Sequence, residues 1–265
     1  MSDVLYDVED GVAIITWNRP DRLNAWTDDL QESYFSALHD AVSDGDVRAI
    51  VVTGAGSGFC AGADLEILET VRQSGGAIER PPSTYPFQVP KLIVGAINGA
   101  CAGMGLVQAL YMDVRFASTT AKLTTSFAKI GLVAEYGIDW LLARLVGPGV
   151  AIDLLASSRI ILGEEAERMG LVNATYQPED LLPAAMAYAQ SVAASCSPSS
   201  IAIMKWQMRR SGDLSFEEAE TVGRQLMGIS FKGPDFWEGL SAISDKREPH
   251  FPSLGMGTNF KEVTK

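Results

Sequence analysis

Apolar and polar positions along the chain follow two patterns that together predict an α/β fold. Residues 12–17, 49–53 and 92–97 are continuously apolar and rich in β-branched side chains, as buried strands are. Between the first two runs, Leu30, Tyr34 and Leu38 recur at helical spacing after Thr27, which is placed to cap the helix. Strands that alternate with helices predict crossover units in a largely parallel sheet.

The pattern changes after Gly147, where the chain becomes mostly helical. Residues 216–229 and 234–243 fit two amphipathic helices, the first with Ser215 as its N-cap. We therefore expect an α/β core over residues 1–195 and a C-terminal helical region over residues 196–265. Several apolar side chains of these helices exceed what one short tail can bury, which predicts contact with another subunit. They are Leu226, Ile229, Phe236, Trp237 and Leu240.

Composition and charge narrow the classes of function. The 265 residues carry a net charge of −12, which argues against nucleic acid, because its binding relies on Lys and Arg at phosphates. The sequence has no apolar run long enough to span a bilayer, and three scattered cysteines favour a reducing, cytoplasmic setting. The two histidines, His39 and His250, give little material for a metal site, and we expect no metal.

Glycine-rich segments follow two strands at places where a ligand can meet backbone amides. In the turn at 54–58, Phe59 stands where a dinucleotide fingerprint needs its third glycine, so no nucleotide cofactor is expected. Residues 57–65 and 98–106 each lie between a strand and a helix-like run. Two helix starts that face each other would hold one carbonyl oxygen between two N–H donors. The alternative is two tight turns whose glycines serve geometry alone.

The turn-rich segment over residues 75–90 is open to two interpretations. A long connection without a periodic pattern fits a mobile lid over a binding site. It fits an ordinary surface insertion equally well, and the residues themselves do not separate the two.

Short motifs spread over nearly the whole chain form a specific set. Residues 59–65 read FCAGADL and resemble F-x-A-G-A-D-[LI]. Residues 91–105 resemble K-P-x-I-A-A-x-N-G-x-x-x-G-G-G, with Leu92 in place of the proline. NRPDRLNA at 18–25 resembles an N-R-P-x-x-x-N-A entry loop. Three later segments resemble the patterns L-x-R-L-V-G, G-L-V and E-K-R, namely LARLVG at 142–147, GLVN at 170–173 and DKR at 245–247. Together these motifs resemble the crotonase (enoyl-CoA hydratase/isomerase) superfamily.

The resemblance implies a ClpP-like spiral of ββα units whose C-terminal helices assemble trimers or hexamers. It implies an acyl-CoA thioester as ligand, with coenzyme A as part of the substrate. The thioester oxygen would lie between the amides of Ala61 and Met104, where Met104 replaces the usual glycine. Lys246 would approach the CoA phosphates, although a solvated surface charge fits it as well. The residues expected to line the adenine and pantetheine are Arg22, Leu23, Gly62, Ala63 and Asp64.

Two positions argue against ordinary hydratase chemistry within this family. Val107 and Phe127 align with the two hydratase glutamates, and neither side chain transfers a proton. GLVAEYG at 131–137 resembles the isomerase pattern G-L-x-x-E-x-G, which makes Glu135 the candidate base for moving a 3-enoyl-CoA double bond to the 2-position. Alternatively, Glu135 has only a structural role, in which its negative charge stabilises the start of the next helix. Asp139 lies four residues after Glu135, so it either shares a helical face with Glu135 and tunes it or faces solvent.

Other classes of function stay open. One is another carboxylate-dependent crotonase reaction, such as thioester hydrolysis. Dehalogenation is disfavoured. In the family's dehalogenases a tryptophan and a histidine support an aspartate nucleophile, whereas here Phe127 aligns with that tryptophan and no histidine is near. Another class is a non-catalytic acyl-CoA carrier. The acyl chain and the pathway do not follow from the sequence.

Overall fold

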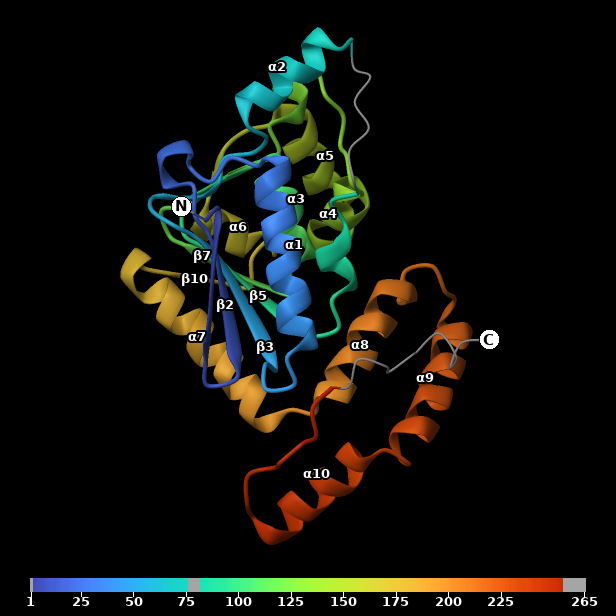
Figure 1. The fold of residues 1–265 in the computed structure, drawn as a ribbon. Helices are drawn as coiled ribbons and strands as arrows, with labels where there is room; N and C mark the ends of the chain where they lie inside the picture. Colours follow the sequence, from blue (N-terminus) through green and yellow to red (C-terminus); the bar gives the residue numbers. More distant parts are fainter. Residues whose placement is uncertain (1, 76–81, 255–265) are drawn as a thin grey trace.

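Strands of the computed structural model, which describes residues 2–75 and 82–254, form two sheets (Figure 1). The strands of the larger sheet are β1 Val4–Glu9, β2 Val12–Trp17, β3 Ala49–Gly54, β5 Leu92–Ile97, β7 Val114–Ser118 and β10 Ala174–Tyr176. They lie side by side in that order, with β1 antiparallel to β2 and the later neighbours parallel. The strands of the smaller sheet are β4 Gly58–Cys60, β6 Ala100–Ala102, β8 Lys122–Thr124 and β9 Ile161–Leu162.

A repeated strand–strand–helix unit connects the two sheets. β3 lies in the larger sheet, β4 lies in the smaller one, and helix α2 (Leu65–Gln73) follows. β5, β6 and helix α3 (Met104–Tyr111) repeat this order, and β7 and β8 begin it again. Each repeat adds one strand to each sheet, so the chain winds as the spiral of ββα units that the family resemblance implies.

Helices cover both faces of the larger sheet (Figure 1). On one face, α7 (Pro178–Ser195) packs its buried alanines against the sheet. On the other face lies α1 (Asp28–Ser43), which starts where the Thr27 hydroxyl accepts a hydrogen bond of 3.1 Å from the Leu30 amide, as predicted.

The strand β3 shows why residues 49–52 are all apolar. Val51 belongs to the cluster under α7, whereas Ile50 and Val52 face the main core on the other side of the sheet. A strand buried on both faces has no polar side, so it reads as a continuous apolar run.

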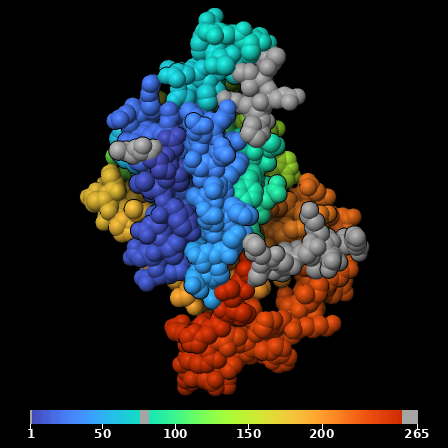
Figure 2. Space-filling view, in the orientation of Figure 1, coloured from blue at the N-terminus to red at the C-terminus, as the bar shows by residue number. Residues whose placement is uncertain are grey.

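The C-terminal helices extend away from the sheets at one end of the molecule (Figures 1 and 2). Ser215 caps α9 through a capping box with Glu218, as its position predicts. The division of the chain near residue 195 stays a prediction, although α7 ends there. The remaining helices are α4 Ile138–Val146, α5 Pro148–Ser157, α6 Gly163–Arg168, α8 Pro198–Ser211, α9 Phe216–Ser230 and α10 Pro234–Asp245.

A buried lysine attaches α8 to the core. The ammonium group of Lys205 donates to the Asp113 carboxylate and, at 2.5 Å, to the Lys91 carbonyl oxygen. Lys91 itself donates to the carbonyl oxygens of Ala41 and Asp44 at 2.7 and 2.6 Å. These bonds satisfy two buried ammonium groups and connect the helical extension to β5 and α1.

The described residues cover only part of the expected loop over residues 75–90, and they bear on the expected lack of a membrane-spanning segment. Residues 76–81 of the expected loop lie outside them, and the described end of that loop contains the short 3-10 helix Tyr85–Gln88. Across the described ranges, each helix is too short or too polar to span a lipid bilayer.

Candidate active site

The two glycine-rich junctions lie side by side at the ends of β4 and β6. These strands pair in parallel, with Cys60 opposite Cys101. Gly62 and Gly103, which follow them, have φ of +104° and +46°, a region that side-chain-bearing residues rarely adopt. A Cβ built on Gly103 would lie 3.8 Å from the Gly62 Cα. The facing junctions predicted from the sequence are therefore present.

The amide of Ala61 is not available to a ligand, which corrects the expectation for this residue. It donates a hydrogen bond of 3.0 Å to the Leu23 carbonyl oxygen. The amide of Ala63 takes its place as the candidate donor. Trp26 bonds to the residues on either side of Ala63, through the Gly62 carbonyl and the Asp64 amide. The Ala63 N–H therefore points away from Trp26, and it has no hydrogen-bond partner within the described part of the chain.

The second candidate donor is the amide of Met104, the first residue of α3. First-turn amides of a helix have no partner inside the helix, and the Met104 amide bonds to no other described residue. The positive end of the helix dipole lies at the same place and favours negative charge there. The Met104 side chain is only 5% exposed and packs into the main core. Its extra length over glycine is thus taken up by the core.

The loop over residues 18–25 is held against the first junction by polar contacts. The Arg19 guanidinium donates to the Asp64 carboxylate at 3.1 Å, and the second carboxylate oxygen of Asp64 caps α2 through the Glu66 amide. Burial alone would raise the pKa of Asp64, but the Glu66 amide and the nearby Arg19 and Arg22 guanidinium groups hold it below its usual value. Asp64 therefore stabilises the walls of the site as a buried anion.

The other residues expected to line CoA differ in exposure. Arg22 lies on the surface, where its guanidinium is 3.4 Å from the Glu66 carboxylate. Leu23 is 39% exposed and adopts a left-handed backbone conformation, with φ of 48°. Gly62 is buried and Ala63 is half-buried. An exposed cation and an exposed apolar side chain on the loop that bonds to Ala61 would suit a ligand with a charged end and an apolar arm.

Glu135 lies half-buried in the turn before α4. The Tyr111 hydroxyl, at the end of α3, donates a hydrogen bond of 2.5 Å to the carbonyl oxygen of Tyr136, the next residue. Burial, together with the charges of Tyr136 and Glu135, raises the pKa of the Tyr111 hydroxyl. The Glu135 carboxylate is therefore within electrostatic reach of the helix whose first amide is that of Met104.

The two positions where hydratases carry glutamates are buried in the core. Val107 is fully buried on α3, and Phe127 is 5% exposed. Asp139 is exposed in the first turn of α4. His39 and His250 are both exposed, and the described residues contain no group of three or more His, Cys, Asp or Glu side chains that could hold a metal ion.

Lys246 is not gathered with the other predicted site residues. It is exposed and directly follows α10, which lies at the opposite end of the molecule from α2 (Figure 1). Within one chain it therefore stands apart from the junctions at Gly62 and Gly103.

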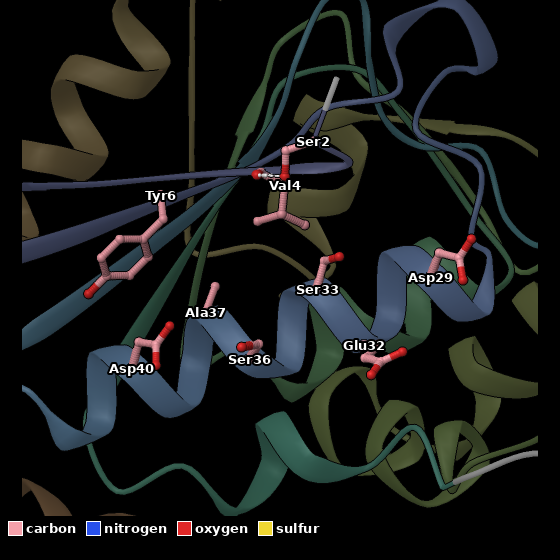
Figure 3. A pocket seen from close by; sticks show the side chains of 9 residues that line it. All are labelled: Ser2, Val4, Tyr6, Asp29, Glu32, Ser33, Ser36, Ala37 and Asp40. Atoms are coloured by element: carbon pink, nitrogen blue, oxygen red, sulfur yellow. Dashed lines mark hydrogen bonds between the residues drawn. The ribbon is translucent and has the colours of Figure 1, made fainter.

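A separate groove opens between β1 and α1. Its volume is about 620 Å³, and Asp29, Glu32 and Asp40 are spaced along its α1 side (Figure 3). Burial and the charges of Asp44 and Asp40 raise the pKa of Tyr6, which lines it. None of its lining residues is basic and none belongs to the predicted site, so the groove does not suit the phosphates of CoA.

From the sequence, Ala63 is expected to line the site, but its amide is not recognisable as a donor, and neither Arg19 nor Tyr111 is expected to have a role. Arg19 stands inside the NRP motif and could have been found as the partner of an acidic residue. Tyr111 carries no sequence signal, because its contact depends on how the loop after the short 3-10 helix Phe127–Ile130 folds back onto α3.

Comparisons with known proteins point to one family. Residues 7–253 match the enoyl-CoA hydratase/isomerase family. The chain is 30% identical to 1,2-epoxyphenylacetyl-CoA isomerase of Escherichia coli (strain K12), over 95% of this chain and 98% of that protein. It is 36% identical to a probable enoyl-CoA hydratase of Mycobacterium tuberculosis (strain CDC 1551 / Oshkosh), over 92% and 98%. The crystal structure of a probable enoyl-CoA hydratase/isomerase from Mycobacterium abscessus matches with a TM-score of 0.87 at 25% identity, over 96% and 100%. The chain therefore has the crotonase fold and belongs to the enoyl-CoA hydratase/isomerase family of acyl-CoA enzymes.

Proposed function

We propose that this protein moves the double bond of a 3-enoyl-CoA to the 2-position, with Glu135 as the base. The observation that carries the proposal is the arrangement around α3. The first amide of this helix, that of Met104, has no partner among the described residues, and its last side chain, Tyr111, holds the turn that bears Glu135. A polarising donor at one end of a rigid helix, and a carboxylate-bearing turn bonded to its other end, fit an enolisation.

The reaction needs one base and one place for negative charge. The Glu135 carboxylate takes a proton from C2, and the electrons of that C–H bond delocalise onto the thioester oxygen and, through the C3–C4 double bond, onto C4. The amides of Ala63 and Met104 stabilise the resulting dienolate. The carboxyl group of Glu135 then returns the proton at C4, which leaves the double bond between C2 and C3.

Hydration fits the same site poorly. Adding water across a double bond needs a group that activates the water and a group that protonates the neighbouring carbon. The side chains of Val107 and Phe127, at the family's hydratase positions, are apolar and buried. Glu135 would have to perform both tasks alone.

A second candidate is isomerisation of an aromatic acyl-CoA, the activity that the name of the Escherichia coli relative gives. Aromatic rings gather near the Glu135 turn and favour this candidate. The ring centroid of Phe87 is 5.9 Å from that of Tyr111 and 6.5 Å from that of Trp140. Such rings would suit an aromatic acyl group.

A panel of CoA esters tests the proposal. Purified protein is mixed with a 3-enoyl-CoA, a 2-enoyl-CoA, a saturated acyl-CoA and 1,2-epoxyphenylacetyl-CoA, and the products are separated by chromatography. We expect the 3-enoyl ester to be converted to its 2-enoyl isomer. Binding of the esters without any conversion would favour the carrier alternative, and turnover of the epoxide alone would favour the second candidate. Hydration as the main reaction would contradict the proposal.

A further inference from the structure

Tyr111 is nearly fully buried at the end of α3, yet its hydroxyl bonds to a loop and not to the core. It is 3% exposed, and its ring lies 5.9 Å from the ring of Phe87. The hydroxyl donates a hydrogen bond of 2.5 Å to the Tyr136 carbonyl oxygen. A buried tyrosine hydroxyl needs a partner, and here the partner belongs to the turn that carries Glu135.

That turn depends on outside support. Tyr136 has φ of 53° and Gly137 has φ of 73°, so two consecutive residues are left-handed. This conformation is unfavourable for a residue with a side chain, such as Tyr136. Within the turn, the Ile138 amide donates to the Glu135 carbonyl oxygen at 3.1 Å. The Tyr111 hydroxyl adds a bond from a rigid element.

Helix α3 sets the spacing between the two halves of the site. Met104 is its first residue and Tyr111 its last, seven residues later, which corresponds to about 10 Å along a helix axis. We propose that Tyr111 is a positioning residue, which fixes the Glu135 turn relative to the Met104 amide through the Tyr136 carbonyl. This inference rests on the proposed role of Glu135 as the base.

The electrostatics of the contact agree with such a role. Burial first, and then the charges of Tyr136 and Glu135, raise the pKa of the Tyr111 hydroxyl, so it stays protonated and remains a donor at neutral pH. The bond goes to a backbone carbonyl, so its loss would move the base without changing its chemistry. Small errors in the position of a catalytic group lower the rate strongly while leaving binding intact.

The test compares two tyrosine-to-phenylalanine variants of the full chain. Tyr111→Phe removes the hydrogen bond and keeps the ring against Phe87. Tyr34→Phe is the matched control, because Tyr34 is fully buried in the core and its hydroxyl has no partner among the described residues. We expect kcat for 3-enoyl-CoA isomerisation to fall by about 10- to 100-fold in Tyr111→Phe, with KM changed by less than about twofold. Tyr34→Phe should match the wild type in both.

Two further readouts separate positioning from general destabilisation. Hydrogen exchange at the Ile138 amide should be faster in Tyr111→Phe than in the wild type or in Tyr34→Phe. In a Glu135→Gln background, Tyr111→Phe should lower the residual rate no further, because there is no base left to position. Unchanged kcat and unchanged exchange in Tyr111→Phe, beside an inactive Glu135→Gln, would overturn the role of Tyr111 alone. A wild type without isomerase activity, or an active Glu135→Gln, would overturn the proposed function and the role of Tyr111 with it.

Discussion

At the scale of single residues, the site depends on which backbone amides remain unpaired. In a regular extended segment, the amides of Ala61 and Ala63 would point to the same side. Gly62, with φ of +104°, breaks this alternation, so the Ala61 amide bonds to Leu23 and the Ala63 amide does not. The sequence showed the motif and its glycine but not the direction in which each N–H points. That direction depends on the pairing with Trp26, which lies far away in sequence.

The proposed oxyanion hole, which consists of the Ala63 and Met104 amides, can be tested by removing one donor. Ala63→Pro deletes the amide hydrogen, and we expect the isomerisation rate to fall on the order of a hundredfold or more. The carbonyl stretch of a bound acyl-CoA, measured by isotope-edited infrared spectroscopy, should shift back toward its frequency in water. Ala63→Gly and Met104→Leu keep both amides and should retain activity within a fewfold. Equal carbonyl frequencies in the wild type and Ala63→Pro would exclude this donor.

At the scale of elements, the long apolar strands and the capped helices were predictable. Residues 12–17 and 92–97 match the observed β2 and β5, and the helices after Thr27 and Ser215 begin where predicted. The smaller sheet was not predictable, because its strands have two or three residues each and carry no periodic signal. Their pairing follows from the repeated strand–strand–helix units that also build the larger sheet.

Close packing between α3 and β4 should be sensitive to a single methyl group. A Cβ on Gly105 would lie 2.2 Å from the Cys60 carbonyl oxygen, so α3 and β4 would have to separate. We expect Gly105→Ala to lower the free energy of unfolding by about 1–3 kcal/mol and to reduce activity. Gly149→Ala in α5 is the control, since a Cβ there meets no atom within 4 Å, and it should be neutral or slightly stabilising. Chemical denaturation measures both, and equal effects would contradict the packing argument.

The attachment of α8 should depend on pH through Lys205. Burial lowers the pKa of this lysine to about 8, even though Asp113 opposes the shift. Between pH 8 and the unfolded value near 10.5, the unfolded chain binds a proton that the folded chain has lost. The lysine's contribution to the free energy of unfolding therefore rises with pH in this window, by about 3 kcal/mol at most.

Denaturation curves from pH 7 to 10 measure this contribution as a difference between the wild type and Lys205→Met. The difference should shift in favour of the wild type as the pH rises above 8. Lys232→Met, at an exposed position between α9 and α10, is the control and should follow the wild type in parallel. A pH-independent difference for Lys205→Met would contradict the lowered pKa.

At the scale of the whole molecule, the C-terminal helices leave apolar surface uncovered. Leu226 is buried within the chain and Phe236 is half-buried, so these two do not support the predicted subunit contact directly. Trp237 and Ile243 of α10 are 61% and 78% exposed, and Phe216 of α9 is 80% exposed. Monomeric proteins rarely expose large apolar patches, so exposed side chains of this size on two consecutive helices favour contact with another subunit. Self-association, like the cytoplasmic location, stays a prediction.

Light scattering on the purified protein at micromolar concentration measures the assembly. We expect a trimer or a hexamer, and we expect a double substitution of Trp237→Ser and Ile243→Ser to weaken it, because both side chains lose apolar area that a neighbour would bury. A neighbouring chain would also have to bring Lys246 to the CoA phosphates. The affinity for CoA should therefore fall when the double substitution weakens assembly. A monomeric wild type would contradict the predicted subunit contact and leave Lys246 a surface charge.

The comparison of wild type with Glu135→Gln tests the central claim most directly. The glutamine keeps the shape of the side chain and removes the base. We expect isomerisation of a 3-enoyl-CoA to fall by roughly 10²–10⁴-fold, while the affinity for the acyl-CoA changes by less than about twofold. Asp139→Asn, at the exposed carboxylate four residues on, should leave the rate unchanged. A Glu135→Gln variant that isomerises the substrate at nearly the wild-type rate would contradict the account.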